Sequence, residues 1–358
     1  MTTVKVIGAG SIGNHLAHGC RSKGWDITIV DLSPEALERT RDTIYPSRYG
    51  VWDEAITLAT PDEVTGKVFD IVIVGTPPAT HLGVATAELR ATPPQLMLIE
   101  KPLSHPDNVA IRDFVQLAQE SASRVLVGYN QRHKPNTQKF VEIAKDPALG
   151  KLVGLSSHML ESWDGILKAH FWMASEKDSY LAFTDQGGGA LLEHSHALNL
   201  MLHFAKEVGQ GNAVKVDATI DWVDHESGRY DRDTKLNVTL DSGLVAEVRQ
   251  DLHTWPAKKE AVATFENGSV VWTMGDSSDS VTLVAADGTQ ANHWDFPKTR
   301  PDDFLGEITH LGDLLEKPEQ PSSLDLEHGL RVMEVALAAM ESSAVGTTAS
   351  VSSLGVID

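Results

Sequence analysis

Three glycines near the start of the chain, Gly8, Gly10 and Gly13, restrict its fold more than any other feature. They stand in G-x-G-x-x-G spacing, after the apolar residues 4–7 and before a helical pattern that continues toward Gly24. In such a turn the first glycine permits a tight bend and the second lets the backbone approach a pyrophosphate. The third allows close packing of the helix on the strand. The spacing therefore predicts a strand, a phosphate-binding turn and a helix.

A carboxylate follows at the position that this motif requires. The second predicted strand, residues 27–30, ends in Asp31, which lies 18 residues after Gly13. The acid that binds the ribose hydroxyls of a dinucleotide is expected about 20 residues after the glycines. Asp31 would repel a 2′-phosphate, so NAD is expected rather than NADP. Nearby Ser33 and Arg39 keep NADP open as the alternative.

Apolar runs continue to alternate with helical patterns over the first third of the chain. Predicted strands begin near residues 69, 96 and 124, and short loops join them to the intervening helices. This alternation is typical of a parallel, doubly wound α/β sheet, here a Rossmann domain over residues 1–128. Ligands of such sheets bind beyond the carboxyl ends of the strands. The cofactor-binding residues expected there are Gly8, Gly10, Ser11, Ile12, Gly13, Asp31, Thr76, Pro77, His81, Glu100, Lys101 and Asn130.

The pattern changes in residues 129–358. Alternating apolar runs are joined by turn signals at residues 241–243, 267–268 and 287–288, which indicate antiparallel hairpins. Two late helical stretches begin near residues 304 and 326, and the last helix is expected to pack back on the first domain. We predict a second, α+β domain with a large open, mainly antiparallel sheet. Its tryptophans (Trp222, Trp255, Trp272, Trp294) mark either a subunit interface or an internal core.

Composition excludes several classes of partner. Lys and Arg number 30 against 50 Asp and Glu, so the net charge of −20 repels nucleic acids and anionic membranes. The single cysteine, Cys20, cannot form an internal disulfide and fits a reducing compartment. No apolar run approaches the roughly 20 residues of a membrane span. A cytoplasmic protein is expected.

The stretch GGGALLEHSHALN carries polar residues that a second-domain helix would place on one face. In an unbroken helix after residues 187–189, Glu193, His196 and Asn199 would align at steps of three. A solvated helix face is the alternative, but the intervening positions are apolar. His194 and His196 would lie about 200° apart and could not chelate one ion together. No metal is expected.

These motifs, taken in order, resemble the glucose–fructose oxidoreductase / inositol dehydrogenase / MocA (Gfo/Idh/MocA) family. The glycine motif with Asp31, TPPATH, EKPL, YNQRHKP and GGGALLEHSHALN cover essentially the whole chain. The resemblance implies a nicotinamide-dependent sugar or polyol oxidoreductase, which forms homodimers or homotetramers through the C-terminal sheet. It also implies that Lys101 is the active-site lysine, and that the following Pro102 is cis.

One motif departs from the family pattern, in which an Asp precedes the catalytic His by four residues. Glu193 precedes His196 by three, so His196 is the predicted catalytic histidine and Glu193 a substitute for the acid. His196 would accept the hydroxyl proton while Lys101 polarises the reacting oxygen. The residues expected to bind substrate are Lys101, Arg132, Trp163, Lys168, His170, Trp172, His194 and His196.

Two other functions fit the same motifs. An NAD-dependent glycoside hydrolase would oxidise its substrate transiently and show no net turnover of the nicotinamide. A sensor or repressor of the same fold would bind sugar and cofactor without catalysis, but it would not need Lys101 and His196. The sequence names neither the sugar nor the direction of the reaction.

Overall fold

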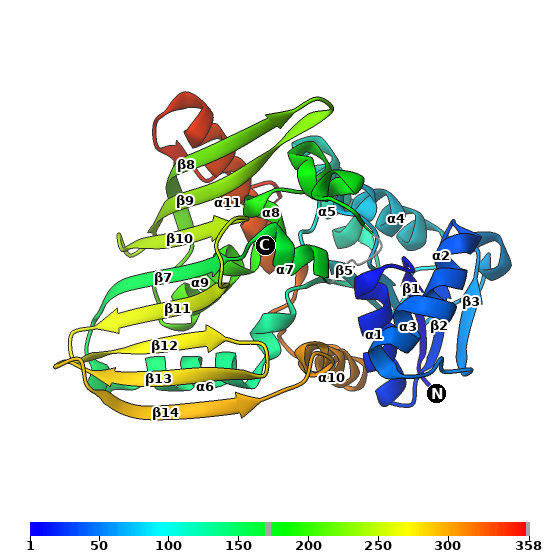
Figure 1. Cartoon of the computed structure of the whole chain (residues 1–358), viewed down its shortest axis with the longest axis horizontal. Coiled ribbons are helices and arrows are strands. Elements are labelled where there is room, and N and C mark those ends of the chain that lie inside the picture. The colour runs from blue at the N-terminus through cyan, green and yellow to red at the C-terminus, as the bar shows by residue number, and fades with distance from the viewer. Residues whose placement is uncertain (169–172, 356–358) are drawn as a thin grey trace.

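The chain forms two sheets with helices packed between and around them (Figure 1). The computed structural model describes residues 1–168 and 173–355. His170 and Trp172, two of the predicted substrate residues, lie outside the described residues. Among the helices of the described part, none has the length and apolar character of a membrane span.

The first sheet is parallel throughout and has the strand order β3-β2-β1-β4-β5-β6. This order confirms the predicted doubly wound sheet, whose connections reverse direction between β1 and β4. The central strands are buried on both faces, as β4 (Ile71–Val74) and β5 (Leu96–Glu100) illustrate. β3 (Ile56–Ala59) is a strand that the sequence analysis did not predict. The other strands of this sheet are β1 (Thr3–Ile7), β2 (Asp26–Val30) and β6 (Arg124–Gly128).

Helices cover both faces of the first sheet. α1 (Ser11–Ser22) follows the glycine motif directly, as predicted. Between β2 and β3 the chain forms α2, a short π-helical turn and α3, which ends next to the first turn of α1. The remaining helical bounds are α2 (Pro34–Arg39), α3 (Tyr45–Tyr49), α4 (Pro78–Ala91) and α5 (Asn108–Glu120).

The second sheet has the order β14-β13-β12-β11-β7-β10-β9-β8-β15. All neighbouring strands are antiparallel except β7 and β10, so the mainly antiparallel prediction is confirmed. The turn signals at 241–243, 267–268 and 287–288 each join two of these strands. The strands are β7 (Leu152–Leu160), β8 (Ala213–His225), β9 (Gly228–Leu240), β10 (Val245–Asp251), β11 (Lys258–Phe265), β12 (Gly268–Met274), β13 (Ser278–Ala285), β14 (Gln290–Pro297) and β15 (Ala349–Ser350).

One face of this sheet is packed against α6, α9 and α11. Trp272 lies fully buried on that face, and its indole N–H donates to Thr137, so it belongs to the internal core. Trp255, by contrast, is exposed. The helices of this part are α6 (Pro135–Ala144), α7 (Trp163–Lys168), α8 (Ala190–Glu193), α9 (His196–Glu207), α10 (Asp302–Glu316) and α11 (Leu326–Val345).

Both late helices also contact the first sheet domain. On α10, Ile308 packs against Gly19 of α1, and the Phe304 ring stacks on His15 with 4.9 Å between ring centroids. α11 packs against β6, where a Cβ on Gly329 would come within 2.4 Å of Val127. These contacts join the two parts of the chain firmly.

Candidate functional site

The glycine turn is tight at two of its glycines and open at the third. A Cβ on Gly8 would lie 2.7 Å from the carbonyl oxygen of Gly75, and one on Gly13 would lie 2.0 Å from that of Gly8. Around Gly10 there is nothing within 4 Å of such a Cβ. The open side adjoins the first N–H groups of α1, which have no partners within the helix. These residues fit a dinucleotide pyrophosphate.

Asp31 stands at the end of β2, beside the same turn. Its two carboxylate oxygens accept from the backbone N–H groups of Ala9 (2.8 Å) and Ser33 (2.9 Å). Each oxygen retains acceptor capacity, because a carboxylate offers about four lone-pair sites. The Ser33 hydroxyl donates to Glu35, so it is engaged within its own turn. The orientation of Asp31 fits a ribose diol.

His81 lies behind the strand ends. Its Nε2 is 2.7 Å from the carbonyl oxygen of Thr76, and its Nδ1 is 3.0 Å from that of Pro102. Burial lowers the pKa of His81 to about 4, so the ring is neutral and donates to one of these two oxygens. The ring therefore joins the turn after β4 to the turn after β5, while Thr76 and exposed Pro77 face the strand edge more openly.

Glu100 and Asn130 point into the protein. Burial raises the pKa of Glu100 to about 7, although Lys101 acts in the opposite direction. Its carboxyl packs on Gly128, where an added Cβ would come 2.7 Å from Oε1. The Asn130 amide donates to the carbonyl oxygen of Asp303 on α10. Both side chains support the edge from inside, whereas the sequence analysis assigned them to the cofactor.

Lys101 meets the second domain at Glu193. The peptide bond between Lys101 and Pro102 is cis, as the resemblance implies. The ammonium donates to the carbonyl oxygen of Glu193 (2.7 Å) and lies 3.3 Å from its carboxylate Oε2. The Tyr180 hydroxyl donates to the same Oε2 (3.3 Å). Tyr180 was missed by the sequence analysis, because it lies in a loop without periodicity.

The predicted single helix over residues 190–203 is wrong. α8 ends at Glu193, His194 and Ser195 form a turn, and α9 begins at His196. Glu193 and His196 therefore do not share one helical face. The break instead directs the backbone carbonyl and the carboxylate of Glu193 toward Lys101.

The glycine triplet that precedes α8 packs against protein rather than against an open site. Gly187 abuts Pro78 of α4, and Gly188 abuts the backbone of residues 180–181. At Gly189, with a φ of +87°, an added Cβ would lie 1.9 Å from Oδ1 of Asp231. Asp231 is fully buried and accepts from the backbone N–H of Leu191 (2.6 Å). Glycine is required here because three other segments approach closely.

His196 begins α9 beside Tyr129, with the two rings edge to face at 5.7 Å between centroids. The Tyr129 hydroxyl donates to Ser195 (3.2 Å). Burial first, and then the charge of Lys101, lower the pKa of His196 well below its usual value, so the imidazole is neutral. Within the described residues, its Nδ1 and the Nε2 of His194 are buried without a hydrogen-bond partner.

Three more of the predicted substrate residues, Arg132, Trp163 and Lys168, are described by the structure. Each of them contacts groups other than Lys101. Arg132 is buried, and its guanidinium donates to Asn199 (2.7 Å) and to the carbonyl oxygen of Ser323 (2.8 Å). The Trp163 indole N–H donates to Tyr230 within a small apolar cluster. Lys168 is exposed over the ring of Trp255. Arg132 thus fastens α9 from inside.

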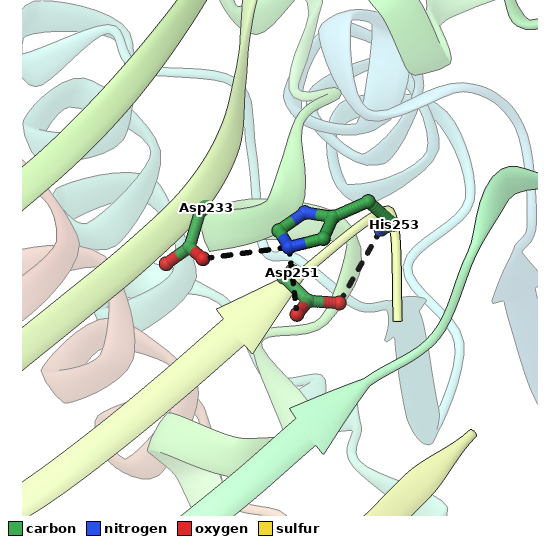
Figure 2. A group of neighbouring side chains, drawn as sticks. All are labelled: Asp233, Asp251 and His253. Carbon is green, nitrogen blue, oxygen red and sulfur yellow. Dashed lines mark hydrogen bonds and ion pairs between the residues drawn. The ribbon is translucent and has the colours of Figure 1, made fainter. Parts of the chain in front are cut away.

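A group of possible metal ligands lies elsewhere: Asp233 is on β9, Asp251 ends β10, and His253 follows β10 (Figure 2). Nε2 of His253 is 3.8 Å from Asp233 and 3.6 Å from Asp251. Asp251 already accepts from Thr254, and Arg249 lies 3.7 Å from Asp233. The two aspartates thus serve as partners of neighbouring side chains and of the backbone.

Comparison with known proteins finds a family model that matches the first domain. Residues 2–129 match the model of the Gfo/Idh/MocA oxidoreductase family with an NAD-binding Rossmann fold. This match confirms the resemblance that the motifs indicate and the expected NAD-dependent oxidoreductase. No curated protein matches the sequence.

Solved structures match over nearly the whole length. A levoglucosan dehydrogenase in complex with NADH and levoglucosan has a TM-score of 0.79 at 16% identity, covering 98% of this chain and 99% of its own. An aldose-aldose oxidoreductase from Caulobacter crescentus has a TM-score of 0.76 at 16% identity, with coverage of 98% and 99%.

A putative myo-inositol dehydrogenase from Sinorhizobium meliloti has a TM-score of 0.73 at 18% identity, covering 98% of this chain and 100% of its own. At these identities the likeness concerns the fold. Residues 2–129 therefore match the NAD-binding Rossmann domain of the Gfo/Idh/MocA oxidoreductase family, and the whole chain shares the fold of these solved structures.

Proposed function

We propose that the chain is an NAD-dependent dehydrogenase or reductase that acts on a hydroxyl or carbonyl carbon of a sugar, polyol or sugar derivative. One observation carries the proposal. Lys101 follows β5, whose carboxyl end lies at the same sheet edge as the glycine turn, and it meets Glu193 of the second domain, while its charge acts on neutral His196. A cation and a neutral base thus converge beside the expected nicotinamide position.

The bound nicotinamide would accept the hydride that leaves the carbinol carbon. The substrate hydroxyl loses its proton to His196, whose neutral imidazole has an available lone pair. Lys101 stabilises the developing negative charge on the oxygen by a charge-assisted hydrogen bond. In the reverse direction, His196 returns the proton as the carbonyl oxygen becomes a hydroxyl.

Glu193 acts on this reaction through Lys101. Its carbonyl and carboxylate hold the ammonium, and Tyr180 limits the freedom of the carboxylate. We therefore assign Glu193 as a positioning residue, and Lys101 and His196 as the catalytic pair. His194, which is buried beside Glu193, remains a candidate for contact with the substrate.

The substrate class rests on the fold and on the relatives. The levoglucosan dehydrogenase and the aldose-aldose oxidoreductase act on sugars by their names, and both match this chain over 98% of its length. A site that pairs an ammonium with an imidazole suits a polyhydroxylated substrate, because both groups hydrogen-bond to hydroxyl oxygens. The identity of the sugar is a question for the substrate panel below.

The test is a measurement of NADH absorbance with a panel of sugars, polyols and ketosugars, in both directions and with both cofactors. Lys101→Met should lower kcat by about 1,000-fold, on the scale of losing one donor to a developing oxyanion, without loss of NADH binding. Lys67→Met, an exposed lysine in the same domain, is the matched control.

Two results would redirect the proposal. NADH binding with hydrolysis of a glycoside but no net absorbance change would indicate the glycoside hydrolase. Binding of both sugar and cofactor without any turnover would indicate the sensor.

We also propose that copies of the chain associate through the second sheet. Helices α6, α9 and α11 cover only one of its faces. Val262 and Val271, paired on β11 and β12, lie on the opposite face. Light scattering on the purified chain tests this proposal, and a monomeric mass at micromolar concentration would contradict it.

A further inference from the structure

A cavity of about 640 Å³ lies between α6, α9, α10 and the loop that precedes α11. Small-molecule sites in proteins typically have volumes of roughly 300 to 1,000 Å³. On α9 the cavity is lined by His203 and Glu207, about two and three turns after His196. The cavity is therefore distinct from the site around Lys101.

The floor of this cavity is buried and its rim is exposed. Arg132, His203 and His310 line the cavity and are each at most 9% exposed. Gln138 of α6 and Thr309 of α10 also line it, and both are exposed. A small molecule can thus enter at the rim and reach the floor.

Arg132 is a buried cation, and its hydrogen-bond acceptors among the described residues are all neutral. Its guanidinium donates to the side-chain and carbonyl oxygens of Asn199 and to the carbonyl oxygen of Ser323. These bonds leave two of the five N–H groups of a guanidinium. Burial lowers the pKa of Arg132 to about 10, and the charge of Glu207 acts in the opposite direction. The carboxylate of Glu207 is itself bound by Lys145.

The imidazoles beside Arg132 do not balance its charge. Burial first, and then the charge of Arg132, lower the pKa of His203 well below its usual value. Burial, His310 and Arg132 lower the pKa of His133 to about 3, and its ring stacks on that of His310 with 4.0 Å between centroids. His203 and His133 are therefore neutral. A buried charge is ordinarily paired with an opposite charge, which neither imidazole supplies.

We propose that this cavity binds a small organic carboxylate whose negative charge lies against Arg132. The two remaining N–H groups of the guanidinium suit the two oxygens of one carboxylate. A phosphate monoester would bring close to two negative charges at pH 7, which one guanidinium does not balance. Asp313 lines the cavity and is exposed, so a second negative charge on the ligand is disfavoured at the rim.

The rest of the ligand should carry hydroxyl groups. The Gln138 amide both donates and accepts, and the Thr309 hydroxyl, which donates to the carbonyl oxygen of Leu305, can still accept. A monocarboxylate with several hydroxyl groups, such as a sugar acid, matches an anion site at the floor and hydrogen-bonding groups at the rim. The inference does not depend on the proposed function, because Lys101 takes no part in it.

The test is calorimetric titration of the whole chain with gluconate and with glucitol, which has a hydroxyl group in place of the carboxylate. Gluconate should bind with a Kd of about 1 mM or lower. Glucitol should bind about 10- to 100-fold more weakly, the range for loss of a charge-assisted contact. Arg132→Gln should weaken gluconate binding to the same extent, and its Tm is measured because Arg132 also fastens α9.

A second variant leaves the floor of the cavity intact. Gln138→Trp should fill the rim and raise the Kd for gluconate at least about 10-fold, since the indole would occupy the space of the ligand. Gln116→Trp, on the exposed side of α5, is the matched control and should leave the Kd unchanged.

Three results would overturn the inference. They are no binding of gluconate to the wild-type chain, equal binding of glucitol and gluconate, and gluconate binding that Gln138→Trp does not weaken. The last result would place the gluconate elsewhere, as in the site around Lys101. Lys101→Met should lose NADH-linked turnover and still bind gluconate, so a failure of this inference and a failure of the proposed function can be told apart.

Discussion

The two halves of the candidate site are supported in different ways. Lys101 extends from the end of β5, a strand that is buried between two parallel neighbours and therefore fixed by backbone hydrogen bonds. Glu193 and His196 lie on either side of a helix break, which depends on Asp231 and on the close packing of Gly189. The first half is rigid by virtue of its sheet. The second depends on a few buried contacts, so single substitutions should affect it more.

The largest expected effect tests whether the second half takes part in the chemistry. His196→Asn should lower kcat by about 100- to 10,000-fold, the range of a lost general base, because asparagine cannot accept the hydroxyl proton. NADH affinity should change little. The measurement is steady-state kinetics on the best substrate of the panel.

His203→Asn, on the same helix two turns farther on, is the control for a general loss of structure. If both variants keep their activity, His196 is not the base. The site would then consist of the Lys101 half alone.

Substitution at Gly189 tests the tight packing of the second half. Gly189→Ala should lower stability by roughly 3 kcal/mol, because its Cβ would meet Asp231 and its φ of +87° disfavours a side chain. Gly288→Ala is the matched control. Gly288 has a similar φ of +83° but nothing within 4 Å, and it should cost only about 1 kcal/mol. Urea unfolding of both variants measures the difference, and equal losses would show that the packing at Gly189 is loose.

The two halves of the site also differ in how well the sequence predicts them. The end of β5 at Glu100 follows from a local apolar run, and the parallel sheet brings the other predicted strand ends to the same edge. The break after Glu193 depends on Asp231, 40 residues from the Leu191 that it binds, and on Pro78 of the other domain. No local pattern contains these contacts. The same holds for Tyr180, which reaches the site from a short 3-10 helix.

The contribution of Asp231 to stability should change with pH. Burial raises its pKa to about 7, from about 3.9 in an unfolded chain. The folded chain therefore binds the proton more tightly, so the contribution of Asp231 to stability is complete below about pH 4 and is lost as the pH rises through 7. Asparagine does not ionise. The Tm of Asp231→Asn relative to wild type should thus increase by roughly 2–4 °C between pH 5 and 8.

Calorimetry at both pH values gives this difference directly. Other buried groups also titrate, but they contribute equally to both proteins and cancel. Asp113→Asn, on the exposed side of α5, is the control and should show no such trend. A Tm difference that stays constant between these pH values would mean that Asp231 is ionised in the folded chain over this range.

The smallest expected effect concerns the link between the two halves. Tyr180→Phe removes the hydrogen bond to Glu193. Lys101 stays in contact with the backbone carbonyl oxygen and with carboxylate Oε2 of Glu193. We expect kcat/KM to fall about fivefold, as for the loss of one hydrogen bond of about 1 kcal/mol. Tyr45→Phe, whose hydroxyl meets His18 far from the site, is the control. A loss above 100-fold would be too large for a residue that acts only by positioning Glu193. It would transfer the proton-accepting role from His196 to Tyr180, and both catalytic groups would then be held by Glu193.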